Sequence, residues 1–383
     1  ASGALNLTYY SGETGTPYWL MLPSSYDGKT VTSIGDPSGT KVIGSDNCIG
    51  RLTIPESYTS IGNKAFSSCT ALLSVDFGAN SHVTSIGDYA FYYTTDLVSI
   101  TIPDGVTTIG EYAFSTTRSL TSVIIPESVE TLGLLCFHNS GITSVTFDEN
   151  CQLTLFDTGL FYGAKLTSIE IPAGIKTLSS NALYRCPLTS VTFAEGSQLE
   201  TIMNGVFGYS TLPSIDLPPT VTSIGYSAFS NSSLSKITIL NPDTVFLDDD
   251  VFAGTPMVAE GAAAETGIYG LDNSTAETYA NENGINFHTI YKITYDSNGG
   301  SAVDAAYLSN GSSVTAPTEP TKEGYHLEGW YEDAALTQQV TFPYTPSASV
   351  TLYAKWAPDN FTVSFNSNGG GAVASQEILP GEK

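Results

Sequence analysis

The stretch Leu97–Thr117 reads LVSITIPDGVTTIGEYAFSTT and contains every feature that decides the fold. Leu97, Ile100 and Ile102 are separated by small polar residues, and the period of two at their end predicts a short strand with one buried face. Proline follows at once, and because proline donates no backbone hydrogen bond it ends the strand there. The I-G-x-x-A-F segment at Ile109–Phe114 then predicts a turn, permitted by its glycine, and an apolar segment too short for a long helix.

The same unit recurs nine times, with first apolar positions 22 to 25 residues apart. These positions are Ile49, Leu72, Leu97, Leu120, Ile142, Leu166, Leu188, Leu212 and Leu234. One coil of this length cannot bury its own apolar side chains, so the coils are predicted to stack as a solenoid. A small residue follows the conserved Phe by three positions in every coil, which indicates a tight buried corner. The corner residues are Cys69, Thr94, Thr117, Ser140, Ala164, Cys186, Ser210, Ser232 and Thr255.

The repeating pattern LxxIxIPxxVTxIGxxAFxx(C/S/T) resembles the BspA-like leucine-rich repeats of bacterial surface proteins, over about residues 17–255. The resemblance implies a mostly β solenoid with short helical turns, secreted or anchored at the cell surface. Tyr18–Pro23 followed by Val31–Gly35 is similar to a divergent N-terminal capping coil. An insert around Asp36–Asn47 delays the next coil.

A different module follows the solenoid. Ser274-Thr275-Ala276-Glu277 fits a capping box, which predicts a short helix over Ser274–Asn283 in a C-terminal cap. Asp296–Gly300 predicts a hairpin turn, and Asn366–Gly370 repeats it 70 residues later. This spacing and the surrounding Tyr and Trp residues resemble the internalin B-type (Listeria–Bacteroides) repeat, which implies a small β-rich, β-grasp-like module.

These patterns predict five segments in chain order. They are an N-terminal capping coil and insert (1–48), a nine-coil solenoid (49–255), a cap and linker (256–290), one internalin B-type repeat (291–358) and the start of a second (359–383). Because the second copy is incomplete at residue 383, the natural chain is expected to continue.

The charge balance excludes several classes of partner. The chain has 13 Lys+Arg against 38 Asp+Glu, a formal net charge of −25. Nucleic acids and anionic membrane surfaces are bound through clustered cations, so neither is an expected partner. The longest apolar runs have the length of a strand, so no membrane insertion is expected in this segment. The five cysteines form no CxxC pair and are odd in number, which argues against a disulfide scaffold or a structural zinc site; they are Cys48, Cys69, Cys136, Cys151 and Cys186.

Two residue groups are candidates for a catalytic or metal site. Cys136 and His138 are two residues apart, which allows a thiol nucleophile with a base, but Cys136 also occupies the Ala position of the motif, which favours a small core residue. Asp248–Asp250 offers oxygen ligands for Ca²⁺, or only variable surface positions of the last coil. We expect no enzyme activity and no cofactor.

Two surfaces are candidates for binding. Outward strand positions form an expected concave face that is rich in hydroxyls and mildly acidic: Asp76, Thr101, Thr146, Glu170, Thr192 and Asp216. Aromatic residues just after the conserved Phe form an expected stripe: Tyr92, Tyr93, His138, Tyr162, Tyr184 and Tyr209. Since Tyr carries binding energy more often than Thr or Asp, the stripe is the stronger candidate. The alternative is that its rings only cover the coil corners.

The resemblance to both families implies an extracellular adhesion protein that recognises a protein or glycan on host or neighbouring cells. The competing hypothesis is a recognition or spacer region of a larger secreted enzyme whose catalytic domain lies outside this segment. The partner and the oligomeric state do not follow from the sequence.

Overall fold

The computed structural model describes residues 5–7, 18–35 and 49–378. Internal contacts divide the chain into two units. The first contains residues up to 268 together with 274–287, and the second contains 269–273 together with the residues from 288 onward. The first unit is the solenoid with its cap, and the second holds the β-rich module.

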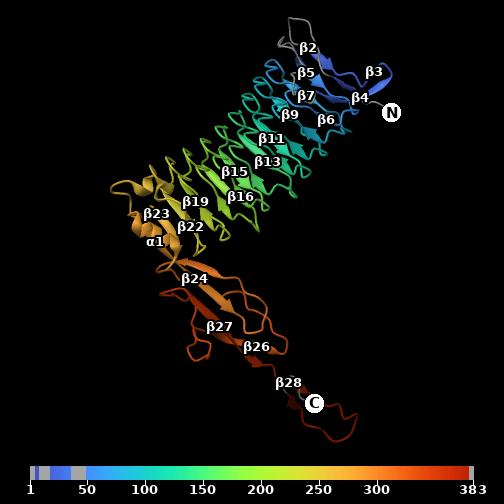
Figure 1. Cartoon of the computed structure of the whole chain (residues 1–383). Helices are drawn as coiled ribbons and strands as arrows, with labels where there is room; N and C mark the ends of the chain where they lie inside the picture. The colour runs from blue at the N-terminus through green and yellow to red at the C-terminus, as the bar shows by residue number, and fades with distance from the viewer. Residues whose placement is uncertain (1–4, 8–17, 36–48, 379–383) are drawn as a thin grey trace. The chain divides into compact units, whose positions relative to one another are not determined.

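The opening strand of each coil lies parallel to that of a neighbouring coil along the solenoid (Figure 1). These long strands are β2 (Tyr18–Met21), β5 (Ile49–Thr53), β7 (Ser74–Asp76), β9 (Ser99–Ile100), β11 (Ser122–Ile125), β13 (Ser144–Phe147), β15 (Ser168–Ile171), β17 (Ser190–Phe193), β19 (Ser214–Asp216) and β21 (Lys236–Ile239). Equivalent positions pair: Val123 with Val145, and Ile169 with Val191. The register therefore follows the sequence repeat, as predicted.

A second column of parallel strands runs through the I-G segments, and the sequence interpretation missed it. The short strands are β4 (Lys29–Ile34), β6 (Ser60–Ile61), β8 (Ser85–Ile86), β10 (Thr108–Ile109), β12 (Thr131–Leu132), β14 (Leu155–Phe156), β16 (Thr177–Leu178), β18 (Thr201–Ile202), β20 (Ser223–Ile224) and β22 (Val245–Phe246). Most are only two residues long, which is too short for a period-two pattern to reveal. In the last coil Phe246 pairs with Ile224, while the next residue, Leu247, is exposed.

The first coil has the expected strands. β2 pairs with β5, and β4 pairs with β6, with β1 (Leu5–Leu7) and with β3 (Ser25–Tyr26). The expected insert at 36–47 and Cys48 lie outside the described residues.

The conserved phenylalanines form stacked columns in the interior. Phe66, Phe91, Phe114, Phe137 and Phe161 stack with ring centroids 5.3 to 5.5 Å apart. Leu183 takes this position in the next coil, and a second column follows at Phe207, Phe229 and Phe252. Each such ring pair adds about 0.5–1.5 kcal/mol beyond simple burial.

The predicted small corner residues are all buried. Several satisfy their polar group locally: the Thr94 and Thr117 hydroxyls donate to the carbonyl oxygen three residues earlier, at 2.6 and 2.8 Å. The Cys186 thiol instead donates to the Phe161 carbonyl of the preceding coil, at 3.0 Å. The corners therefore link neighbouring coils as well as closing each one.

The glycine of the I-G segment has a different role from the one that we predicted. A Cβ on Gly110 would lie 2.6 Å from the Asp88 backbone nitrogen of the preceding coil, and its φ is not positive. Gly62, Gly87, Gly133 and Gly225 approach the preceding coil equally closely. This glycine therefore sets the distance between coils and is not needed for the turn.

The long-strand sheet is divided into short ladders. The ladder breaks between β9 and β11, between β13 and β15, and between β17 and β19. Between β15 and β17, which are paired, Ala194 N–H after the strand donates back to Ile171 O at 3.0 Å. The coils after the three breaks carry Pro126, Pro172 and Pro218 at this place, and proline has no N–H to donate. The equivalent Pro55 and Pro103 follow β5 and β9, which stay paired, so proline alone does not cause the breaks.

The C-terminal cap contains two 3₁₀ turns, η1 (Asp249–Phe252) and η2 (Pro256–Val258), strand β23 (Gly267–Leu271) and helix α1 (Thr275–Glu282). The predicted capping box is confirmed, because the Ser274 hydroxyl accepts the Glu277 N–H at 3.2 Å. Tyr279 of α1 stacks on Phe246 with ring centroids 4.2 Å apart, which covers the last coil. No helix in the described ranges is long and apolar enough to cross a membrane.

The second unit is built on β24 (Phe287–Asp296), which pairs with β25 (Ala306–Ser309) and, in parallel, with β27 (Val350–Pro358). β26 (Tyr325–Tyr331) completes this sheet beside β27. Its small core gathers Ile293, Trp330 and Leu352. β28 (Phe361–Val363) pairs with β29 (Gln376–Ile378) at the start of the second repeat. The β-grasp likeness of this module stays a prediction.

Candidate binding surface

The outward side of the long strands, here called the strand face, carries all six residues of the expected concave face. Each is exposed: Asp76, Thr101, Thr146, Glu170, Thr192 and Asp216. Ile124 lies among them and is 60% exposed. Glu170 pairs across the sheet with Thr192, but the breaks separate other members from their neighbours. The strand face is therefore a series of short ladders, not the continuous face that we expected.

A cavity of about 650 Å³ opens on the strand face at the break between β17 and β19. Thr192 and Asp216 line it together with the hydroxyls of Ser190 and Ser214, and Pro218 forms part of its wall. The cavity thus lies where two neighbouring long strands are not paired. The cavity is shallow and its charge comes from Asp216.

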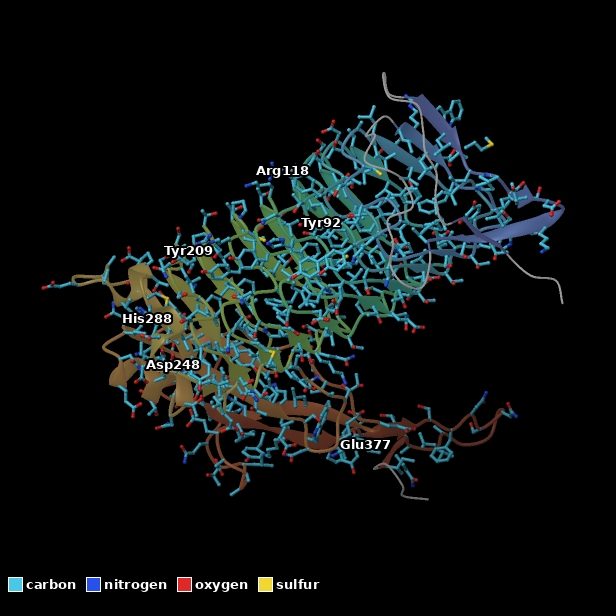
Figure 2. All side chains as sticks on the ribbon, turned by 45° about the horizontal axis from the view of Figure 1, so that its top comes forward. Tyr92, Arg118, Tyr209, Asp248, His288 and Glu377 are labelled. Carbon is cyan, nitrogen blue, oxygen red and sulfur yellow. The ribbon has the colours of Figure 1, made fainter. Side chains whose placement is uncertain are left out.

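The predicted aromatic residues lie in one continuous row of contacting rings, which we call the ring ladder. The row runs Tyr93, Tyr92, Tyr89, Tyr112, His138, Tyr162, Tyr184 and Tyr209. Successive centroids are 4.8 to 6.5 Å apart, and the geometry varies from stacked to edge-on. Figure 2 shows Tyr92 and Tyr209 among the side chains of well-separated coils. All six expected stripe residues belong to the ladder.

Two members of the ladder were missed in the sequence. The rings of Tyr89 and Tyr112 stack with centroids 4.8 Å apart and an interplanar angle of 9°. They connect the rings of Tyr92 and Tyr93 to that of His138. Each directly precedes the conserved Ala of its coil, two positions before the Phe. The sequence does show this pattern, because tyrosine occupies the same place in two consecutive coils. That place lies before the conserved Phe, whereas the predicted stripe contained only residues after it.

Four tyrosines of the ladder have a left-handed backbone: Tyr89, Tyr93, Tyr112 and Tyr209, with φ between 52° and 59°. Asn and Gly occupy this region more easily, and a residue with a Cβ bears a cost of about 1 kcal/mol there. The position of Tyr93 and Tyr209 is left-handed in the other coils too, which hold Ser68, Thr116, Asn139, Gly163, Arg185, Asn231 and Gly254 there. The left-handed backbone is thus a general feature of this corner, and tyrosine is one of several residues that it accepts.

The two ends of the ladder differ in charge. At one end, burial raises the pKa of Tyr89, and the neighbouring Tyr112, Glu111 and Asp88 raise it further. At the other end, burial and Tyr209 raise the pKa of Tyr184, while the Arg185 guanidinium lowers it. Lys64 Nζ also lies 5.8 Å from the Tyr89 ring centroid, so the first end is bordered by carboxylates and a cation, and the second by a cation.

Cys136 and His138 do not form a catalytic pair in this structure. Burial raises the pKa of the Cys136 thiol far above its usual value, opposite to what a nucleophilic thiol needs. His138 Nδ1 lies 3.2 Å from the Ser115 hydroxyl and its Nε2 lies 3.0 Å from the Asn139 amide. Burial lowers the pKa of His138, so its ring is neutral at pH 7.

Asp248–Asp250 acts as a cap. The Asp248 carboxylate accepts the Asp249 N–H at 2.8 Å and begins η1. The Asp249 carbonyl accepts the Tyr279 hydroxyl at 2.8 Å. No group of three or more His, Cys, Asp or Glu suited to a metal ion occurs among the residues that the structure describes.

Comparison with solved structures agrees with this fold. A leucine-rich repeat protein from Bacteroides ovatus ATCC 8483 superposes with a TM-score of 0.53 at 22% identity, covering 66% of this chain and 63% of that one. A leucine rich cell surface protein from Faecalibacterium prausnitzii A2-165 gives a TM-score of 0.44 at 25% identity, covering 74% of this chain and 89% of that one. The first likeness shows the solenoid fold alone.

Two curated relatives come from Evansella cellulosilytica. A putative Gly-rich membrane protein is 46% identical over 85 residues, and a putative membrane protein is 44% identical over 89 residues. These segments are 22% and 23% of this chain, and 10% and 13% of the relatives. The chain thus spans about a tenth of the length of these relatives.

Family patterns cover most of the chain. The Listeria-Bacteroides repeat domain matches residues 291–355, the greater part of the second unit. The BspA type leucine-rich repeat region matches residues 42–155 and 152–258 in six copies, which is more than half of the chain. The chain therefore belongs to the BspA type leucine-rich repeat family and continues into a Listeria-Bacteroides repeat.

Proposed function

We propose that this chain is an extracellular, surface-presented adhesion protein and that the ring ladder is its contact surface. The observation that carries the proposal is the unbroken contact of eight rings across successive coils, with Tyr93 and Tyr209 39% and 46% exposed. Tyrosine offers a large contact area at a low entropic cost, and it is enriched in binding surfaces.

The choice between binding and covering rests on residue type, not on backbone strain. This corner position is left-handed in every coil, with Ser68, Thr116 and Arg185 as well as Asn139 and Asn231, so the strain alone does not separate binding from covering. We prefer a binding role to the covering role because tyrosine is enriched at binding surfaces.

The family context supports presentation outside the cell. Repeats of both matched families are typical of surface proteins, and the Evansella relatives are named as membrane proteins. In this proposal the solenoid recognises a macromolecule of a host or neighbouring cell, and the β-rich module serves as a spacer. The chain itself performs no catalysis.

The test compares the two candidate surfaces in the full chain. Beads coated with the parent are applied to epithelial cells and to extracellular-matrix proteins, beside a ladder variant with Tyr92, Tyr162 and Tyr184 changed to Ser. The matched control changes three strand-face carboxylates, as Asp76→Asn, Glu170→Gln and Asp216→Asn. We expect the ladder variant to lose most adhesion and the control to retain it.

Thermal unfolding of each variant checks that the solenoid is intact. Should the triple Ser variant unfold early, Tyr93→Asn with Tyr209→Asn removes two exposed rings at positions where asparagine suits the backbone. Full adhesion by a folded ladder variant contradicts the proposed contact surface.

A further inference from the structure

Arg185 lies at the end of the ring ladder between two tyrosine rings. Its guanidinium carbon is 5.6 Å from the Tyr184 ring centroid and 5.1 Å from that of Tyr209. The side chain is exposed, and it forms no ion pair with a carboxylate in the described part of the chain. The Arg185 side chain forms a hydrogen bond with Tyr184, and a guanidinium has five N–H donors, so others stay available to a ligand.

The surroundings of Arg185 favour an anion. Lys165, on the preceding coil, is close enough to lower the pKa of the buried Cys186 next to Arg185. No carboxylate contributes to the pKa shift of Tyr184, whereas Glu111 and Asp88 both act on Tyr89, over whose ring Lys64 also lies. On a protein of net charge −25, Arg185 and Lys165 add positive charge at the Tyr184 end.

The backbone holds this end in place before any ligand arrives. The Arg185 N–H donates to the Gly208 carbonyl at 2.9 Å, and the Tyr209 N–H donates to the Ser230 carbonyl at 3.0 Å. A Cβ on Gly208 would lie 2.8 Å from Cε2 of Tyr184, so the glycine is what allows that ring to lie against the next coil. A preorganised site loses less entropy on binding.

We propose that Arg185, Tyr184 and Tyr209 form a subsite for the carboxylate-bearing sugar of an acidic glycan. The guanidinium takes the carboxylate through two parallel hydrogen bonds. The Tyr184 and Tyr209 rings meet at 70°, and Tyr209 is 46% exposed, so in this proposal the Tyr209 ring and its hydroxyl contact the sugar. The inference rests on the proposed function and specifies the chemistry of its partner.

A glycan fits this subsite better than a protein. Protein interfaces concentrate their energy in side chains that fill apolar pockets. The ladder presents ring edges, hydroxyls and a cation. Two cavities in the described part of the solenoid lie beside Asp216 and beside Glu127, and no ladder residue lines either of them. A flat ligand that is rich in hydroxyls and carries a carboxylate matches such a surface.

The experiment titrates the full chain with an oligogalacturonate by calorimetry. Arg185→Gln is expected to weaken binding at least about tenfold, the usual worth of a charge-assisted hydrogen-bond pair. Arg185→Lys keeps the charge but loses the planar guanidinium, so its affinity should lie between those of the parent and of Arg185→Gln. Arg118→Gln removes an exposed arginine outside the ladder and is expected to bind like the parent.

Two further probes separate the possible sources of the carboxylate. The same oligosaccharide with its carboxyl groups reduced to alcohols should not bind detectably, and an oligoglutamate peptide should bind more weakly than the oligogalacturonate. The proposal is overturned by absent binding of oligogalacturonate, by equal binding of the reduced sugar, by tighter binding of the peptide, or by an unchanged affinity of Arg185→Gln. The adhesion assay separates this failure from that of the proposed function, because loss of adhesion in the Tyr→Ser variant would still support the ladder as contact surface.

Discussion

Tyr209 combines a strained backbone with an exposed ring. It has a φ of 59° and is 46% exposed, and the same left-handed place is held by Thr116 and Asn231 in other coils. Its ring contacts Tyr184 and Arg185, which offset part of the backbone cost.

Two substitutions at Tyr209 separate the backbone from the ring. Tyr209→Asn and Tyr209→Ala both remove the ring, but only Asn suits the left-handed backbone. We expect the Asn variant to be more stable than the Ala variant by about 0.5–1 kcal/mol in urea unfolding. Equal stabilities would mean that position 209 carries no backbone strain.

At the residue scale the sequence predicted six of the eight residues of the ladder, but not which rings contact each other or which charges lie beside them. Tyr92, Tyr162 and Tyr184 follow the conserved Phe, so their alignment came directly from the repeat. Tyr89 and Tyr112 were missed because contact between rings of different positions depends on where each turn directs its side chain. The charge difference between the ladder ends also required coordinates, since it depends on which carboxylates lie near each ring.

Among the elements, the short strands and their glycines set how closely the coils stack. The I-G glycine is a place where two backbones touch, and only the absence of a Cβ permits that distance. The sequence pattern showed that glycine recurs there, but a turn and a close contact produce the same pattern. The neighbouring atoms distinguish the two explanations.

Gly110→Ala is expected to destabilise the chain by about 1–3 kcal/mol, because the new Cβ would meet the preceding coil's backbone. Gly105→Ala is the matched control: its Cβ would lie 3.5 Å from the Val83 carbonyl and its φ is not positive. Gly105→Ala should leave stability unchanged or raise it slightly. Urea unfolding of both variants measures the difference, and equal effects would refute the close-contact explanation.

The phenylalanine column makes a second prediction at this scale. Phe137 is fully buried between Phe114 and Phe161. Phe137→Ala should cost about 3–5 kcal/mol of unfolding free energy. Phe137→Leu should cost no more than about 1.5 kcal/mol, because Leu183 already fills the equivalent place in another coil. Similar losses for Ala and Leu would show that ring stacking, not volume, stabilises the column.

Over the whole molecule, the repeat spacing predicted the solenoid, its register and the following β-rich repeat. Composition and pattern did not predict that the long-strand sheet divides into short ladders. The breaks lie beside Pro126, Pro172 and Pro218, but the equivalent Pro55 and Pro103 leave their strands paired, so the proline pattern does not locate the breaks. Pairing acts between residues more than twenty positions apart, and it follows only once the coils are stacked.

The central claim is that the ring ladder makes contact when the chain adheres. Iodination of tyrosines in the free and the adhering chain, located by mass spectrometry, tests it most directly. The account predicts that adhesion protects Tyr93 and Tyr209, while Tyr26 and Tyr307, exposed tyrosines outside the ladder, are labelled as in the free chain. Undiminished labelling of Tyr93 and Tyr209 in the adhering chain would contradict it.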